Sequence, residues 1–148
     1  MKVSKVLIEQ DEIVQKVNEL AERINKDYSG EELVIVGILK GAFIVISDLA
    51  KQLNVDITFE FMSIQSYEGT KSTGQIKIDK DLDIDITGKN ILIVEDIFDT
   101  GLTISHLKNL LESRNPKSIE ILCMFIKKDI AIEPCLLYTS DAADEDLR

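Results

Sequence analysis

The sequence predicts an α/β fold with a central, mostly parallel sheet, because segments of helical periodicity alternate with short apolar runs. Residues 9–28 form the clearest helical segment, whose apolar face carries Ile13, Val17, Leu20 and Ile24. The runs 33–39 and 90–95 are rich in Val and Ile, as is typical of strands buried on both faces. Ligands of such sheets bind at the carboxyl ends of the strands. We therefore expect functional residues directly after these runs.

The remaining segments continue this alternation within one domain. We expect further strands at 55–64, 75–79 and 118–126, helices at 41–53 and 103–113, and polar connections at 66–74 and 81–90. A chain of 148 residues is long enough to bury a substantial core. No internal repeat or interdomain linker interrupts the pattern.

Composition and charge exclude several classes of protein. The formal net charge of −10 argues against a general nucleic-acid binder, which needs a basic surface. No apolar run approaches the roughly 20 residues of a membrane-spanning helix. The N-terminus lacks the long apolar segment of a secretion signal. We therefore expect a cytoplasmic protein with neither nucleic-acid nor membrane partners.

Cysteine and histidine offer little for chemistry in this chain. Cys123 and Cys135 are too few for a disulfide framework, and no Cys/His cluster has metal-ligand spacing. Cys123 lies in an apolar run, which favours a small core residue over a reactive thiol. The single histidine, His106, falls in an expected helix, where a surface or partly packed role is favoured over catalysis. Catalysis by a histidine dyad or triad is therefore not favoured.

The run Ile91–Thr103 contains the strongest chemical pattern. Its buried strand ends in two acids, Glu95 and Asp96, and the segment Asp99-Thr100-Gly101-Leu102-Thr103 then leads into a helix. Backbone amides at a helix start, threonine hydroxyls and a glycine that permits close approach would suit a monophosphate. The acids suit ribose hydroxyls or a divalent metal. The plainer alternative is a helix cap beside solvated strand-end charges.

The whole run closely resembles the signature of type I phosphoribosyltransferases. The resemblance implies that family's fold, a central mostly parallel sheet flanked by helices, with a mobile lid hairpin or loop. It further implies that Asp99, Thr100, Gly101, Leu102 and Thr103 bind a 5′-phosphate. Glu95 and Asp96 would bind ribose and metal, and Asp99 would also act as the catalytic base or proton partner at purine N7.

Two further segments resemble the hypoxanthine-guanine branch of this family. The stretch 36–43 is similar to its first active-site loop, in which Lys40 and Gly41 would bind pyrophosphate, often across a cis non-proline peptide. Ser66 and Tyr67 resemble the start of the lid, which closes over the reaction centre and excludes water.

The segment Phe125-Ile126-Lys127-Lys128 resembles the purine-binding strand end of the same branch. Lys127 would donate to the 6-oxo group of the base, or Lys128 if the register differs by one residue. A fixed ammonium pairs with an oxo acceptor but not with an amino donor. This lysine therefore favours hypoxanthine or guanine over adenine.

The resemblance implies a purine-salvage transferase that moves 5-phosphoribosyl from its 1-pyrophosphate to N9 of hypoxanthine or guanine. Mg²⁺ is the implied cofactor, and a complete chain would form a homodimer or homotetramer. Two alternatives stay open: a non-catalytic regulator that binds phosphoribosyl pyrophosphate, and an inactive fragment of the enzyme.

The likeness ends after Lys128, where the family carries a purine-stacking segment that residues 129–134 do not match. We therefore expect residues 1–134 to be a phosphoribosyltransferase domain that is incomplete at its C-terminal end. Residues 135–148 are acidic and lack apolar periodicity, which predicts a disordered tail or one foreign to the protein.

Overall fold

The computed structural model describes residues 10–66, 76–98, 102–128 and 131–139. In chain order the elements are α1 (Gln10–Asp27), β1 (Glu32–Ile38), α2 (Ala42–Ala50), β2 (Asp56–Ser66), β3 (Ile76–Lys80), β4 (Asn90–Phe98), α3 (Leu102–Glu112), β5 (Ser118–Lys128) and β6 (Ala131–Thr139). This order confirms the predicted α/β class.

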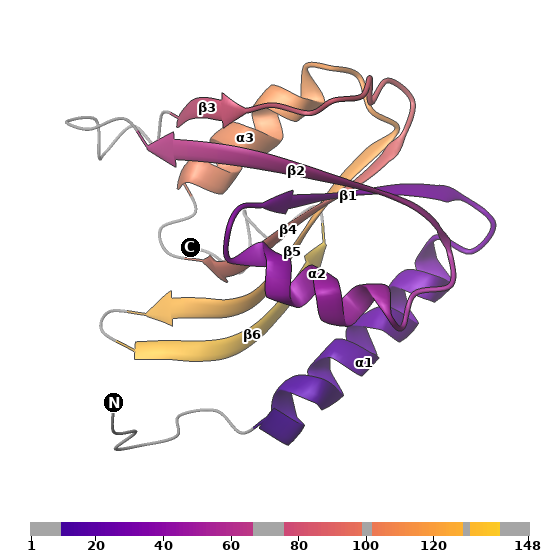
Figure 1. The fold of residues 1–148 in the computed structure, drawn as a ribbon, viewed down its shortest axis with the longest axis vertical. Helices are drawn as coiled ribbons and strands as arrows, with labels where there is room; N and C mark the ends of the chain where they lie inside the picture. The colour runs from indigo at the N-terminus through magenta and orange to yellow at the C-terminus, as the bar shows by residue number, and fades with distance from the viewer. Residues whose placement is uncertain (1–9, 67–75, 99–101, 129–130, 140–148) are drawn as a thin grey trace.

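Six strands form one sheet in the order β3-β2-β1-β4-β5-β6 (Figure 1). The four central strands are parallel, whereas β3 and β6 run antiparallel to their neighbours at the two edges. The carboxyl ends of β1, β2, β4 and β5 therefore lie along one side of the sheet, which we call the carboxyl edge. The amino-terminal ends of the same four strands lie along the opposite side, which we call the amino edge.

Helices cover both faces of the sheet, and this explains the uniformly apolar central strands. Ile91 and Ile93 of β4 belong to the core under α3, whereas Leu92 and Val94 belong to the core under α1 and α2. All four are fully buried. Because alternate residues of a strand point to opposite faces, both sets must be apolar.

The structure differs from the sequence-based expectation at two strands. β4 continues past Asp96 to Phe98, because its backbone still pairs with β5 at Ile97 and Phe98. The two acids therefore lie within the strand instead of after it. The expected elements also lacked β6, which pairs antiparallel with β5 from Ala131 to Thr139. The domain boundary at 134 and the origin of residues 135–148 stay predictions.

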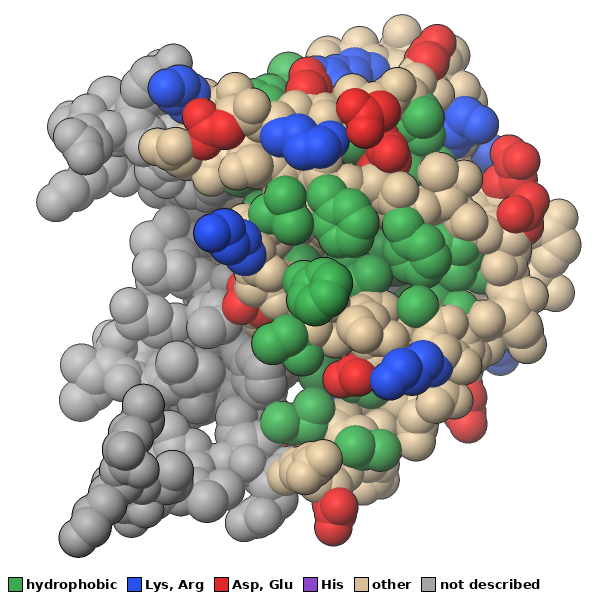
Figure 2. All heavy atoms as spheres, viewed as in Figure 1, with side chains coloured by type: hydrophobic (Ala, Val, Ile, Leu, Met, Phe, Trp, Pro, Cys, Tyr) green, Lys and Arg blue, Asp and Glu red, His purple; other side chains and the backbone are tan. Residues whose placement is uncertain are grey.

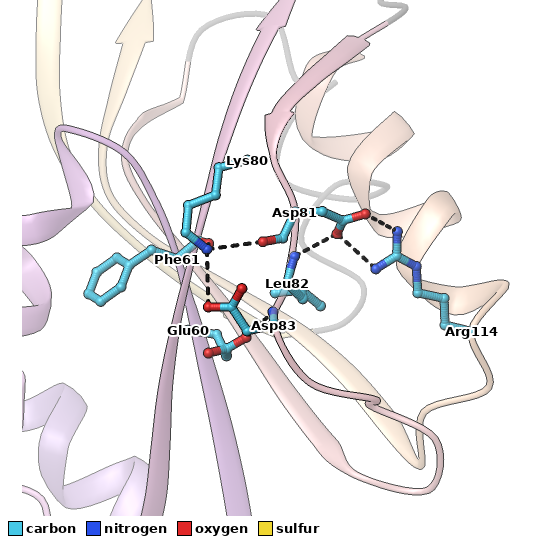
Figure 3. Close-up of polar contacts among 7 residues, drawn as sticks. All are labelled: Glu60, Phe61, Lys80, Asp81, Leu82, Asp83 and Arg114. Atoms are coloured by element: carbon cyan, nitrogen blue, oxygen red, sulfur yellow. Dashed lines mark hydrogen bonds and ion pairs between the residues drawn. The ribbon is translucent and has the colours of Figure 1, made fainter.

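A polar cluster holds the segment that follows β3 against β2 and against the end of α3 (Figure 3). Arg114, just beyond α3, donates two hydrogen bonds of 2.9 and 2.8 Å to the carboxylate of Asp81. The buried carboxylate of Glu60 in β2 accepts a 2.7 Å hydrogen bond from the backbone N–H of Asp83. The segment after β3 is thereby tied both to β2 and to the end of α3.

One face carries several exposed apolar side chains over α2 and β2 (Figure 2). Phe43 and Ile44 of α2 are 62% and 68% exposed, and Phe59 of β2 and Leu39 of the preceding turn are each more than a third exposed.

None of the described helices is long and apolar enough to span a membrane.

Candidate active site at the carboxyl edge

The sheet register brings two predicted segments together. β1 and β4 are parallel neighbours, and Gly37 pairs with Val94. The residues that follow this pair are the turn after Ile38 on one strand and Glu95-Asp96 on the other. β5 flanks β4 on its other side, where Cys123 pairs with Glu95. The turn and the acids therefore meet at the carboxyl edge.

The turn after β1 is short and closely held. The backbone N–H of Leu39 donates to the carbonyl of Met62 at 2.9 Å, and that of Phe43 donates to the carbonyl of Lys40 at 3.1 Å. The Leu39–Lys40 peptide bond is cis, as the resemblance led us to expect. Lys40 itself is exposed. A turn of this kind offers backbone amides and an ammonium group to an anion.

The acid pair has an unusual electrostatic setting. Glu95 is partly buried, and this desolvation, together with the neighbouring Asp96 carboxylate, raises its pKa to about 8. The carboxylate of Glu95 also accepts a 3.0 Å hydrogen bond from the Asp96 backbone N–H, which acts in the opposite direction. A cation beside the pair would favour ionised Glu95 and lower this pKa.

Comparisons with known proteins agree with this geometry. The family model for the phosphoribosyl transferase domain matches residues 6–134. The hypoxanthine-guanine phosphoribosyltransferase of Aquifex aeolicus is 46% identical over 126 residues, covering 84% of this chain and 70% of that protein. The enzyme of the same name from Dictyostelium discoideum is 45% identical over 129 residues, covering 84% and 72%.

A crystal structure of a hypoxanthine-guanine phosphoribosyltransferase from Bacillus anthracis superposes with a TM-score of 0.82 at 37% identity, covering 90% of this chain and 83% of that one. The chain belongs to the hypoxanthine-guanine phosphoribosyltransferase family. In this phosphoribosyltransferase the predicted type I fold is therefore confirmed.

The predicted phosphate-binding segment of this phosphoribosyltransferase is described only in part. The backbone of Leu102 and Thr103 opens α3. Asp99, Thr100 and Gly101 lie outside the described residues, so their roles stay predictions. The described segments still place a helix start directly after β4, as the predicted phosphate site requires.

The predicted lid and purine residues Ser66 and Lys127 lie at the ends of two other parallel strands. Ser66 ends β2, and Tyr67 lies outside the described residues. Lys127 lies near the end of β5, where its backbone pairs with Ile132 of β6. The sheet topology therefore puts Ser66 and Lys127 at the carboxyl edge, with the acids between them in strand order.

The acid pair fits the implied Mg²⁺ by its donor chemistry. Mg²⁺ is commonly held by one or two carboxylates together with substrate phosphates and water. Glu95 and Asp96 supply two adjacent carboxylates at the carboxyl edge. No group of three or more His, Cys, Asp or Glu side chains gathers as a metal site within the part of the chain that the structure describes.

Gly37 is a residue whose role the sequence reasoning missed. A Cβ at this position would lie 3.1 Å from the ring of Phe61 and even closer to Ile46 of α2. In this structure the side chains of Ile46 and Phe61 occupy the space that a side chain at Gly37 would take, immediately behind the turn. The available signal was a glycine inside a run of Val and Ile, which often marks a close approach.

Proposed function

We propose that this chain transfers 5-phosphoribosyl from 5-phosphoribosyl 1-pyrophosphate to N9 of hypoxanthine or guanine, giving IMP or GMP and pyrophosphate. The observation that carries the proposal is the meeting of the turn at Lys40 with the acids Glu95 and Asp96, in a chain of this family. Such a reaction needs anion binding and ribose binding side by side.

In the proposed mechanism, Lys40 and the backbone at Gly41 bind the pyrophosphate group. Glu95 and Asp96 accept hydrogen bonds from the ribose hydroxyls and would hold Mg²⁺. The metal, when bound, neutralises the leaving pyrophosphate and orients it against the ribose. The protein's own contribution is to hold both groups in a fixed geometry.

The remaining residues act on the phosphate, the base and the solvent. Thr100, Gly101, Leu102 and Thr103 bind the 5′-phosphate together with Asp99. Asp99 also faces purine N7 and serves as proton partner. Lys127, or Lys128 in the alternative register, donates to the 6-oxo group. Ser66 and Tyr67 close the site against water.

We also propose a cytoplasmic location and, for a complete chain, a homodimer or homotetramer. A phosphoribosyl pyrophosphate-binding regulator and an inactive fragment are the competing possibilities. The chain spans 70% and 72% of the two relatives described above.

The direct test is incubation with phosphoribosyl pyrophosphate, Mg²⁺ and either hypoxanthine, guanine or adenine. We expect IMP and GMP to form much faster than AMP. The 148-residue chain and a version extended to the length of its relatives should be compared. IMP from the extended chain alone would identify an inactive fragment, whereas binding without turnover in both would identify a regulator.

A second test concerns Asp99→Asn. We expect kcat to fall about 10²-fold or more, the usual range for loss of a general base. The KM for phosphoribosyl pyrophosphate should change only a few-fold. Asp48→Asn, on the exposed side of α2, is the matched control. Equal losses in kcat and in affinity would make Asp99 a binding residue only.

A further inference from the structure

Gly41 is a glycine for a reason other than its backbone conformation. Its dihedral angles are φ −59° and ψ −36°, in the right-handed helical region that any residue adopts. The space around it is the constraint. A Cβ at this position would have the carboxylate of Asp96 as its nearest neighbour, with even the farther oxygen only 2.6 Å away. Real Cβ atoms essentially never approach a non-bonded atom within 3.0 Å.

The backbone is held on both sides of this contact. The backbone N–H of Asp96 donates to the Glu95 carboxylate at 3.0 Å, and its carbonyl accepts a weak hydrogen bond from the Cys123 thiol at 3.7 Å. On the other side, Gly41 precedes Ala42, which is fully buried at the start of α2. The backbones that carry the two groups are therefore fixed, and the Asp96 carboxylate packs against the backbone of Gly41.

We propose that Asp96 is a positioning residue for the turn Leu39–Gly41. Its carboxylate fills the space that a side chain at 41 would take, and so sets the distance between the turn and the acid pair before any substrate binds. This inference rests on the proposed function, in which the turn binds pyrophosphate. It assigns Asp96 a role on the pyrophosphate side of the site in addition to the ribose side.

The competing explanation is that Gly41 leaves room for a ligand. The two explanations make different predictions for the protein without substrate. If the Asp96 side chain requires the glycine, Gly41→Ala strains the empty protein, and removing that side chain relieves the strain. If a ligand requires it, the empty protein is indifferent to Gly41→Ala and only binding suffers.

The first experiment places Gly41→Ala in three backgrounds: the natural sequence, Asp96→Asn and Asp96→Ala. We expect Gly41→Ala to lower the melting temperature by roughly 3–10 °C in the first two, because Asn keeps the shape of Asp. In the Asp96→Ala background, Gly41→Ala should lower the melting temperature by less than half as much. An equal decrease in all three backgrounds, or no decrease in any, would overturn the proposal.

The second experiment measures the binding of pyrophosphate in metal-free buffer by calorimetry, well below the melting temperature. Pyrophosphate has no ribose, and metal-free buffer holds no Mg²⁺, so loss of ribose contacts or of a metal ligand cannot affect the result. We expect Asp96→Asn to keep affinity within about 3-fold, and Asp96→Ala to weaken it by about 10-fold or more. Ser47→Ala, exposed on α2, is the control. Equal affinity of the Asn and Ala variants would reduce Asp96 to a purely structural role and overturn the proposal.

The two experiments separate this inference from the function on which it rests. If the natural chain does not bind pyrophosphate, the function proposed for the turn fails. The coupling between Gly41 and Asp96 in the melting experiment would still show whether the packing is as described.

Discussion

Two pairs of adjacent acids, at opposite ends of the central strands, have opposite surroundings. Glu31 and Glu32 lie at the amino edge, where β1 begins. The carboxylate of Glu31 accepts a 2.7 Å hydrogen bond from Lys117, and Glu32 forms an ion pair of 3.8 Å with Lys89. At the carboxyl edge, Glu95 has no ion pair with a basic side chain among the residues that the structure describes.

Glu31 and Glu95 accordingly have pKa values shifted in opposite directions. The hydrogen bond from Lys117, followed by one from Asn90, lowers the pKa of Glu31. Burial and the adjacent carboxylate raise that of Glu95. The amino edge compensates its acids with lysines, whereas the carboxyl edge leaves Glu95 to be neutralised by a proton or by a bound cation. Strongly shifted pKa values are commonest at functional sites, so this contrast supports the role proposed for Glu95.

The largest effect is expected for Glu95→Gln. We predict a loss of about 10²-fold or more in kcat/KM, together with a higher melting temperature at pH 8. Because the folded pKa of about 8 lies above the ordinary value of 4.5, the natural protein loses stability as pH rises between these values. The stabilisation by Gln should therefore be large at pH 8 and small at pH 5.

Thermal unfolding across this pH range, with activity measured in parallel, checks the prediction. Glu31→Gln is the matched control at the amino edge, where we expect unchanged activity and no gain in stability at pH 8. A melting temperature for Glu95→Gln that tracks the natural protein at every pH would contradict the assigned environment of Glu95.

An intermediate effect is expected for Asp81→Asn in the polar cluster at the base of β2–β3. The hydrogen bonds from Arg114 lower the pKa of Asp81, so its contribution is present above its ordinary value of 3.8 and is lost as pH falls through the folded value. Because Asp81 is largely exposed, solvent screening limits the loss to roughly 0.5–1 kcal/mol at pH 7. Urea unfolding should show a smaller loss at pH 2.5 than at pH 7, and Asp48→Asn should show no loss at either pH.

The smallest effect is expected for Lys117→Met at the amino edge. The change removes the exposed partner of Glu31, so we predict a loss of stability smaller than that for Asp81→Asn and no loss of activity. Salt at about 0.5 M should remove most of the difference, because screening weakens exposed ion pairs. A drop in kcat would show that the two edges are coupled, and would contradict the assignment of the amino-edge acids to stability alone.

The sequence predicts best what depends on local pattern. The apolar run of β4 and the turn at Lys40 were recognisable because each signal lies within a few residues. The extension of β4 to Phe98 and the presence of β6 were missed, since both depend on backbone pairing with β5. The contact of Gly41 with Asp96 was also invisible, because it joins residues that are adjacent only after β4 pairs with β1.

Four residues with predicted roles lie outside the described part of the chain: Asp99, Thr100, Gly101 and Tyr67. They depend on the family resemblance and on the tests above. The backbones of Ser66 and Lys127 lie at the carboxyl edge, where the sequence predicted them. The contacts of their side chains stay predictions.

The strand order has a consequence for how the protein is made. β1 lies between β2 and β4, yet the chain builds β2 and β3 before it reaches β4. During synthesis, one edge of β1 must therefore stay open until residues 90–98 emerge from the ribosome and pair with it. The two halves of the site come from the two sides of this late pairing. A nascent chain stopped before β4 would carry the turn at Lys40 but none of the acids, with an unpaired apolar strand exposed to other chains.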